Sequence, residues 1–376
     1  MEMITLAIHR REKATILENL LIENNIKVKV EEFFDNDVSD STKSYRIRIS
    51  KNDVNKALLI IEKHNLFATK ESLASPDNGL KRILVAVDFS DYSINACGAA
   101  FDLAKRINAK VKILNVIPYI QYPCHVPFAD QLKEPEDVTI LDKARKQMLE
   151  LCFLIDEKIT AGEFPSINYS YSLREGIVEE EVRTFVKEYH PHILVIGTKG
   201  LDASETGIVG GVAADIIEST GIPVLAVPLN TSFKDFSEVN HIAFLTNFDE
   251  RDVLSFVALT KFFEYKQEVK ITLIHIKNRS SRKDVPFEKF NSMLQSFKED
   301  YPQYKIEYKQ IESENIIEPV LRFVEEENVQ VLSLNTQRRN LFGRVFMPSV
   351  SRRLLTKSDT VLLILRGKQL KERTLL

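Results

Sequence analysis

Glycines that could bind an anion are concentrated in one part of the sequence. Of twelve glycines in 376 residues, six lie between residues 197 and 221. The flanking apolar runs predict a buried parallel strand over residues 193–196, a helix over 212–219 and a second buried strand over 223–227. Gly197 and Gly200 allow a tight turn, while Gly210 and Gly211 leave bare backbone N–H groups at the helix start. These donors and the helix dipole favour an anion, for which a phosphate is the obvious candidate.

A carboxylate stands at a second predicted strand end. Asp88 and Ser90 follow a buried strand expected over residues 83–87, and Ser90 is placed to cap a helix that runs to about residue 108. Ligands of open α/β sheets bind at the carboxyl ends of the strands, which favours a ligand here. Two plainer interpretations stay open: the glycine loop could simply turn the chain, and Asp88 could cap a neighbouring loop. The loop matches neither a Walker sequence nor G-x-G-x-x-G.

These motifs resemble the universal stress protein family. Gly197-x2-Gly200-x9-Gly210, followed by Gly-Val-Ala and closed by Ile-Pro-Val-Leu-Ala-Val-Pro, resembles the C-terminal half of a domain of this family. Lys81-Arg-Ile-Leu-Val-Ala-Val-Asp-Phe-Ser90 resembles its opening. The fold implied is α/β, a Rossmann-like (HUP-type) parallel sheet of five strands in the order 3-2-1-4-5, with the site between strands one and four.

The resemblance also implies a ligand, ATP or a related adenine nucleotide, with Mg²⁺ as an accompanying ion. Asp88 and Val116 would contact the adenosine, and the glycine N–H groups the phosphates. The binding residues expected on this basis are Asp88, Ser90, Val116, Gly197, Thr198, Lys199, Gly200, Gly210, Gly211 and Val212. Gly211 departs from the pattern, because ATP-binding members carry Ser or Thr there. No catalytic or metal-ligating residue is assigned.

The pattern repeats after residue 240. Strands expected near residues 241, 271, 305, 329 and 360 follow the order of the first copy, and a shift of 138 residues aligns Phe185 with Phe323 and Val212 with Val350. The repeat has lost the phosphate features: Asn247, Asn335, Arg338 and Pro348 replace Asp88, Gly197, Gly200 and Gly210. We expect no nucleotide there. Five arginines between residues 338 and 353 could form another anion site or a partner surface, or simply a solvated face.

The remaining segments complete the predicted domain organisation. Residues 1–67 predict a small α+β module of ferredoxin-like or PII-like order, β-α-β-β-α, with Ile16, Leu17, Leu20 and Leu21 on one helix face. It weakly resembles a small prokaryotic signal-transducing domain, but could be a packing domain without a ligand. The other boundaries are a linker at 68–80, stress-type domain one at 81–228, a linker at 229–240, domain two at 241–367 and a tail at 368–376.

Composition excludes several classes of protein. A net charge of −3 and a pI near 6.2 give no basic footprint for nucleic acid. No apolar run approaches membrane-spanning length, and three cysteines without C-x-x-C spacing suit a reducing compartment, so a cytoplasmic location is expected. Pairs such as Cys124-His125 lack a third ligand for a metal.

Three functions follow in order of preference. The first is a stress-response or signalling protein that binds adenine nucleotide in its first domain, the second domain serving as a scaffold or as the surface for an unknown protein partner. The second is a nucleotide-free interaction scaffold. The third is slow ATP hydrolysis or phosphoryl transfer involving Lys199 and Thr206, although no acid for the metal is evident. The resemblance implies that the two stress-type domains pair through their fifth strands as an intramolecular pseudo-dimer, and a homodimer of the whole chain is also open.

Overall fold

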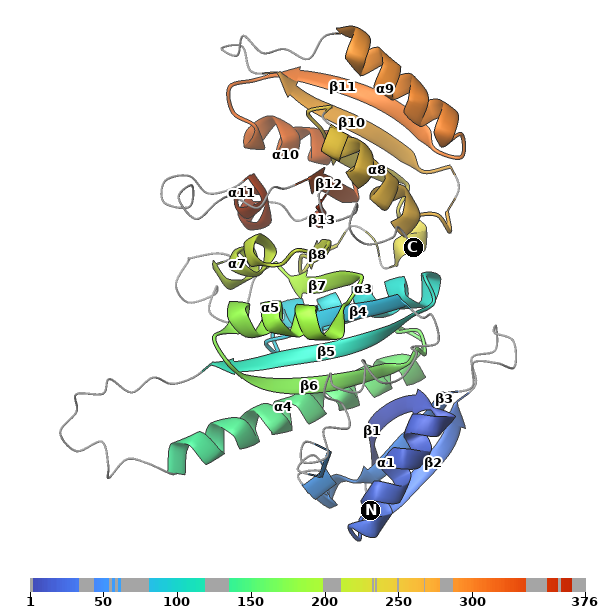
Figure 1. Cartoon of the computed structure of the whole chain (residues 1–376), viewed down its shortest axis with the longest axis vertical. Helices are drawn as coiled ribbons and strands as arrows, with labels where there is room; N and C mark the ends of the chain where they lie inside the picture. Colours follow the sequence, from blue (N-terminus) through green and yellow to red (C-terminus); the bar gives the residue numbers. More distant parts are fainter. Residues whose placement is uncertain are drawn as a thin grey trace, which may run out of the picture. The chain divides into compact units, whose positions relative to one another are not determined.

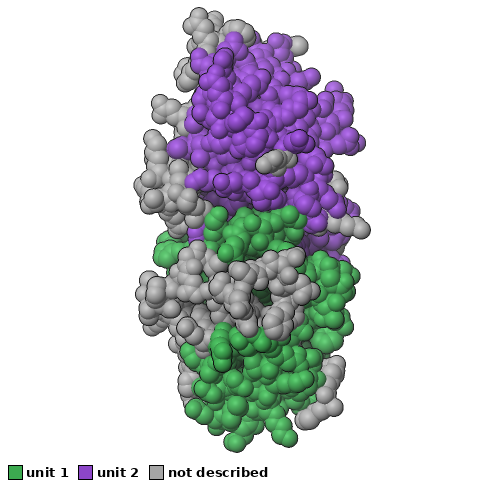
Figure 2. All heavy atoms as spheres, turned by 90° about the vertical axis from the view of Figure 1, so that its right-hand side faces the viewer, with its two compact units in different colours: residues 1–90, 100–191 green, residues 91–99, 192–376 purple. Residues whose placement is uncertain are grey.

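The chain divides into two compact units. The computed structural model describes residues 3–33, 44–53, 56–57, 60–61, 81–118, 135–198, 211–231, 233, 235–248, 250–266, 268–277, 287–335, 350–357 and 360–366. Unit 1 comprises residues 1–90 and 100–191, and unit 2 comprises residues 91–99 and 192–376 (Figure 2). The predicted linker at 68–80 and tail at 368–376 lie outside the described residues.

Unit 1 is built on a mixed sheet in the order β4-β5-β6-β1-β3-β2 (Figure 1). Its strands are β1 (Met3–Arg10), β2 (Val28–Phe33), β3 (Ser44–Ser50), β4 (Lys81–Ala86), β5 (Ala109–Pro118) and β6 (Tyr169–Gly176). Its helices are α1 (Arg11–Glu23), the C-terminal part of α3 (Asp91–Arg106), α4 (Pro135–Thr160) and α5 (Val178–Tyr189). The strands β4, β5 and β6 are parallel, as expected for strands joined by helical crossovers. The β-α-β-β order predicted for the N-terminal module is confirmed, and its β1 meets β6 at the pair Ile8 and Tyr169.

The helix of the N-terminal module buries only part of the predicted apolar face. Ala14, Leu17 and Leu21 are buried, at a spacing of three and four residues that places them on one stripe of α1. Ile16 is 54% exposed, so its predicted place on the same face as Leu17 and Leu21 is wrong. Apolar side chains on adjacent residues cannot all face the sheet, and packing against the alternating Ile47 and Ile49 of β3 decides which do.

Unit 2 contains the complete second copy of the domain. Its strands are β7 (Ile193–Gly197), β8 (Val224–Val227), β9 (His241–Leu245), β10 (Lys270–Lys277), β11 (Lys305–Glu312), β12 (Val331–Asn335) and β13 (Val361–Leu365). Its helices are α7 (Gly211–Ser219), α8 (Glu250–Phe262), α9 (Phe287–Asp300), α10 (Ile317–Glu326) and α11 (Val350–Lys357), with the start of α3. The order β11-β10-β9-β12-β13 is the predicted 3-2-1-4-5, so the predicted fold class is confirmed.

The fifth strands of the two copies pair within unit 2. Leu225 of β8 lies opposite Leu363 of β13 in an antiparallel ladder. Both side chains are buried, at 2% and 1% exposure. The strand pairing expected of a pseudo-dimer is therefore present inside one chain.

The segment between the two copies is packed rather than extended through solvent. In the predicted linker at residues 229–240, Phe233, Phe236 and Val239 are buried. The ring of Phe236 lies 6.2 Å from that of Phe263 at the end of α8. The apolar residues spaced through a polar segment thus anchor it to the second copy.

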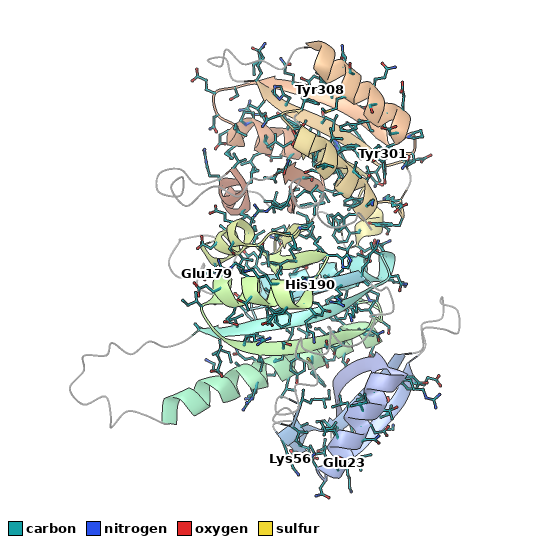
Figure 3. The ribbon with its side chains drawn as sticks, in the orientation of Figure 1. Glu23, Lys56, Glu179, His190, Tyr301 and Tyr308 are labelled. Carbon is teal, nitrogen blue, oxygen red and sulfur yellow. The ribbon has the colours of Figure 1, made fainter. Side chains whose placement is uncertain are left out.

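A cluster of aromatic side chains packs α8 and α9 against the sheet of unit 2. Phe256 is fully buried, with its ring stacked 4.1 Å from Phe297 and edge-on to Phe244 and Tyr301. Tyr301, which follows α9, and Tyr308 of β11 are labelled in Figure 3. Offset and edge-to-face contacts of this kind add to the free energy gained by burial.

A buried histidine, His241, is the first residue of β9 in the sheet of unit 2. His241 Nδ1 lies 2.9 Å from the carbonyl oxygen of Glu327, and Nε2 lies 2.8 Å from Thr272 Oγ1. Because a carbonyl only accepts, Nδ1 carries a proton and donates it to Glu327 O. Nε2 accepts from the Thr272 hydroxyl when the ring is neutral and donates to it when the ring is protonated. Burial lowers the pKa of His241 below its ordinary value of 6.5.

This lowered pKa predicts acid sensitivity. The unfolded state binds more protons than the folded state as pH falls through about 6.5 and towards the folded pKa, so the free energy of unfolding decreases over that range. Urea unfolding followed by circular dichroism at pH 8 and pH 5.5 should show the loss in the wild type. His241→Gln, which does not titrate, should show a smaller difference between the two pH values. An equal difference in both proteins would contradict the assignment.

Among the described residues, no helix combines the length and apolar character needed to cross a membrane.

Candidate functional site

The end of the first strand of copy one holds a fixed carboxylate. Asp88 Oδ1 accepts hydrogen bonds from the Ser90 backbone N–H at 3.1 Å and from Ser90 Oγ at 2.6 Å. Phe89 between them has a left-handed backbone with φ of 66°, which turns the chain sharply into α3. Ser90 is buried and Asp88 is half-buried. The predicted pair Asp88 and Ser90 is thus brought together, and it orients the carboxylate at the carboxyl end of β4.

Hydrogen bonds with the neighbouring strand β5 hold the residues that follow β4. Val116 of β5 is buried, and its neighbour Asn115 donates from Nδ2 to the carbonyl oxygen of Val87 at 2.9 Å. Val87 N–H in turn donates to Leu114 O at 2.9 Å. The sequence interpretation missed Asn115. The available signal was an amide side chain within an otherwise apolar run of a predicted buried strand, which must find a partner.

Gly197 is needed for close packing. It is the last residue of β7, and a Cβ built on it would lie 2.8 Å from Tyr92 Cβ and 3.0 Å from the Tyr92 carbonyl carbon. The start of α3 therefore approaches the backbone of β7 directly. Thr198 follows with its N–H bonded to Val227 O at 3.0 Å and its side chain buried. Residues 199–210, through which the predicted turn would run, lie outside the described residues.

The helix after the glycine loop begins at Gly211, close to the predicted start. A Cβ on Gly211 would meet no described atom within 4 Å, so no described neighbour enforces a glycine here. Val212 is 51% exposed at the first turn of α7. Lys199, Gly200 and Gly210 lie outside the described residues.

The expected site residues are divided between the two units. Asp88, Ser90 and Val116 belong to unit 1, and Gly197, Thr198, Gly211 and Val212 belong to unit 2. Each group lies at the carboxyl end of its parallel strands or at the helix that follows. Their meeting in one crevice stays a prediction.

Comparison with known proteins decides the family. A model described as "Universal stress protein family" matches residues 79–228. A universal stress protein of Methanocaldococcus jannaschii is 23% identical over 177 residues, which cover 46% of this chain and 96% of that protein. Residues 79–228 are a domain of the universal stress protein family. The matched bounds lie close to the predicted 81–228 for stress-type domain one.

One solved universal stress protein, from Archaeoglobus fulgidus, shares the fold. The match with its crystal structure covers 76% of this chain and 96% of that chain, with a TM-score of 0.57 and 14% identity, so the likeness shows the fold alone. Another solved universal stress protein, in complex with cAMP, covers 40% of this chain and 98% of its own, with a TM-score of 0.26 and 19% identity.

The described residues offer neither a metal cluster nor a reactive thiol. No group of three or more His, Cys, Asp or Glu among them is arranged to hold a metal ion. Cys97 and Cys152 are buried and take part in no disulfide, and burial raises the pKa of the Cys97 thiol to about 12. A thiol with that pKa is almost wholly protonated at neutral pH and is a poor nucleophile.

Proposed function

We propose that the first stress-type domain of this chain binds an adenine nucleotide, with ATP as the leading candidate, and that the chain acts as a cytoplasmic stress-response or signalling protein. Asp88 and Val116 contact the adenosine in this proposal. The N–H groups of the loop from Gly197 to Gly211 bind the phosphates. The second domain contributes a scaffold or a partner surface and holds no nucleotide.

The arrangement of Asp88 is the observation that best supports the proposal. Two hydrogen bonds from Ser90 fix the carboxylate at the end of β4, where a hydroxyl-bearing ligand of a parallel sheet would meet it. A carboxylate that is already oriented loses less conformational entropy when it accepts hydrogen bonds from a ribose or an adenine.

The two described glycines that border the loop, Gly197 and Gly211, also support the proposal. The close contact at Gly197 brings α3 against the end of β7, and α7 begins at Gly211 with its first N–H groups unpaired within the helix. Such a helix start favours an anion. Adenosine and phosphate groups therefore each have matching chemistry in the family's expected positions.

The proposal predicts loss of nucleotide in Gly210→Arg. Protein purified from cells is denatured, and released nucleotide is identified by liquid chromatography and mass spectrometry. The wild type should release adenine nucleotide near one per chain, and the variant should release less than about a tenth of it, because a bulky side chain fills the loop and Arg cannot adopt every glycine conformation.

Pro348→Arg is the matched control. Pro348 is the counterpart of Gly210 in the second copy, so the same side chain introduced there should leave the nucleotide content unchanged. Wild-type protein that carries no nucleotide and binds no added ATP would contradict the proposal and favour the interaction scaffold.

A further inference from the structure

The duplicated domains can be compared position by position at the end of their first strands. In copy one, Val87 N–H donates to Leu114 O, and in copy two Thr246 N–H donates to Ile274 O, each at 2.9 Å. Val87 therefore corresponds to Thr246. The next residues but one, Phe89 and Phe248, both have left-handed backbones, with φ of 66° and 57°. The correspondence places Asn247 at the position of Asp88.

The two copies carry a carboxylate at different positions around this strand end and the helix that follows it. The position of Ser93 in α3 corresponds to Asp252 in α8. Copy one thus has a carboxylate at the strand end and a hydroxyl in the first turn of the helix. Copy two has an amide at the strand end and a carboxylate in the helix. This exchange is invisible when only the family's motif positions are compared.

Asp252 is buried at the end of the second sheet. Only 4% of the residue is exposed. Its Oδ2 accepts from Thr246 Oγ1 at 2.8 Å and from the Asn247 backbone N–H at 2.7 Å. Its Oδ1 accepts from Asn335 Nδ2 at 3.2 Å. These donors come from the ends of β9 and β12, which are paired neighbours.

The donors are held in place by further hydrogen bonds. Thr246 Oγ1 accepts from the Phe248 N–H at 2.9 Å, which leaves the hydroxyl proton to point at Asp252. His275 Nδ1 lies 3.1 Å from Thr246 O and braces the same turn. Asn335 stands where copy one has Gly197, so its side chain adds a donor that the first copy lacks. The result is a preorganised set of donors around one negative charge.

The position of this set is the one where a parallel sheet ordinarily receives a ligand. Strands β9 and β12 are strands one and four of the order 3-2-1-4-5, and the crevice of such a sheet opens between their carboxyl ends. We propose that the second copy retains an anion site at this switch point and fills it permanently with its own Asp252 carboxylate. An external anion is excluded because its donors are taken and a like charge is already present. This proposal stands whether or not copy one binds nucleotide.

Removal of the carboxylate tests the proposal by chemical rescue. Asp252→Ala leaves three donors facing a small cavity, and the melting temperature should fall by roughly 5 °C or more. Sodium formate, a small carboxylate that fits the vacated space, should raise the melting temperature of this variant more than sodium chloride does at equal ionic strength. The excess should saturate with concentration.

Asp300→Ala is the matched control, since Asp300 is an exposed carboxylate at the end of α9. Formate should have the same small effect on this variant and on the wild type. If Asp252→Ala does not fold in chloride, recovery of its circular dichroism in formate but not in chloride is the same test, and Asp252→Ser supplies the residue of copy one. A formate effect on the Asp252 variants no larger than on Asp300→Ala would overturn the proposal.

Discussion

Leu363→Asp is expected to unfold the interface between the two fifth strands. Leu363 lies opposite Leu225 in the antiparallel pair of β13 and β8, with 1% exposure. A carboxylate introduced there would be buried without a partner, so the free energy of unfolding should fall by roughly 4 kcal/mol or more. Urea unfolding followed by circular dichroism measures the loss as a lower midpoint or as a first transition that separates from the rest.

Leu229→Asp is the control for this prediction. Leu229 follows β8 and is 40% exposed, so the same substitution should change the free energy of unfolding by no more than about 0.5 kcal/mol. Leu363→Ala should lie between the two, at a cost of about 2–4 kcal/mol for the lost apolar contacts and the cavity. Equal stability of the two aspartate variants would show that β13 and β8 do not pair in solution.

Gly197→Ala is expected to destabilise the protein although it adds one methyl group. The new Cβ would lie 2.8 Å from Tyr92 Cβ and 3.0 Å from a backbone carbon of α3, and backbone cannot move aside as a flexible side chain can. Overpacking of this kind costs roughly 1–3 kcal/mol, and Gly197→Val should cost more. Both variants should also bind less nucleotide, because the loop starts from a displaced strand end.

Gly211→Ala is the control for Gly197→Ala, because it removes a glycine at a position without a close described neighbour. A Cβ at Gly211 meets no described atom within 4 Å, and alanine favours a helix by up to about 1 kcal/mol over glycine. Its stability should equal or exceed that of the wild type in thermal unfolding. If Gly197→Ala proved as stable as Gly211→Ala, the close approach of Tyr92 to β7 would be wrong.

Much of the fold could be predicted from the sequence because it depends on local patterns. Continuous apolar runs such as Ile83–Val85 and Val361–Leu365 mark buried parallel strands, and both runs are confirmed as buried residues of strands. Helical spacing and the short connections between elements limit the topology to right-handed crossovers. The loss of glycines in the second copy is equally local. The duplication therefore needed no tertiary information, and the 3-2-1-4-5 order was implied by the resemblance to the universal stress protein family.

The candidate site was predictable only in part. Asp88 and Ser90 were identified from their place after a strand, and the structure shows them hydrogen-bonded to each other. Their role in a binding site stays a prediction. Gly197 was identified for a tight turn, and the structure adds a packing reason that the sequence did not show. Its neighbour Tyr92 is far away in the sequence, and no local pattern shows that a helix will approach one glycine and leave Gly211 free.

The sequence by itself determined which segments are strands and helices, how often the domain occurs and which strand ends carry polar groups. Only the tertiary structure decided that Asp252 lies among donors from β9 and β12, that Phe236 packs a polar segment onto α8 and that Ile16 faces solvent. The physical reason is the range of the interactions. Periodicity is set by neighbouring residues, whereas a hydrogen bond or a packing contact depends on where distant segments meet once the sheet has formed.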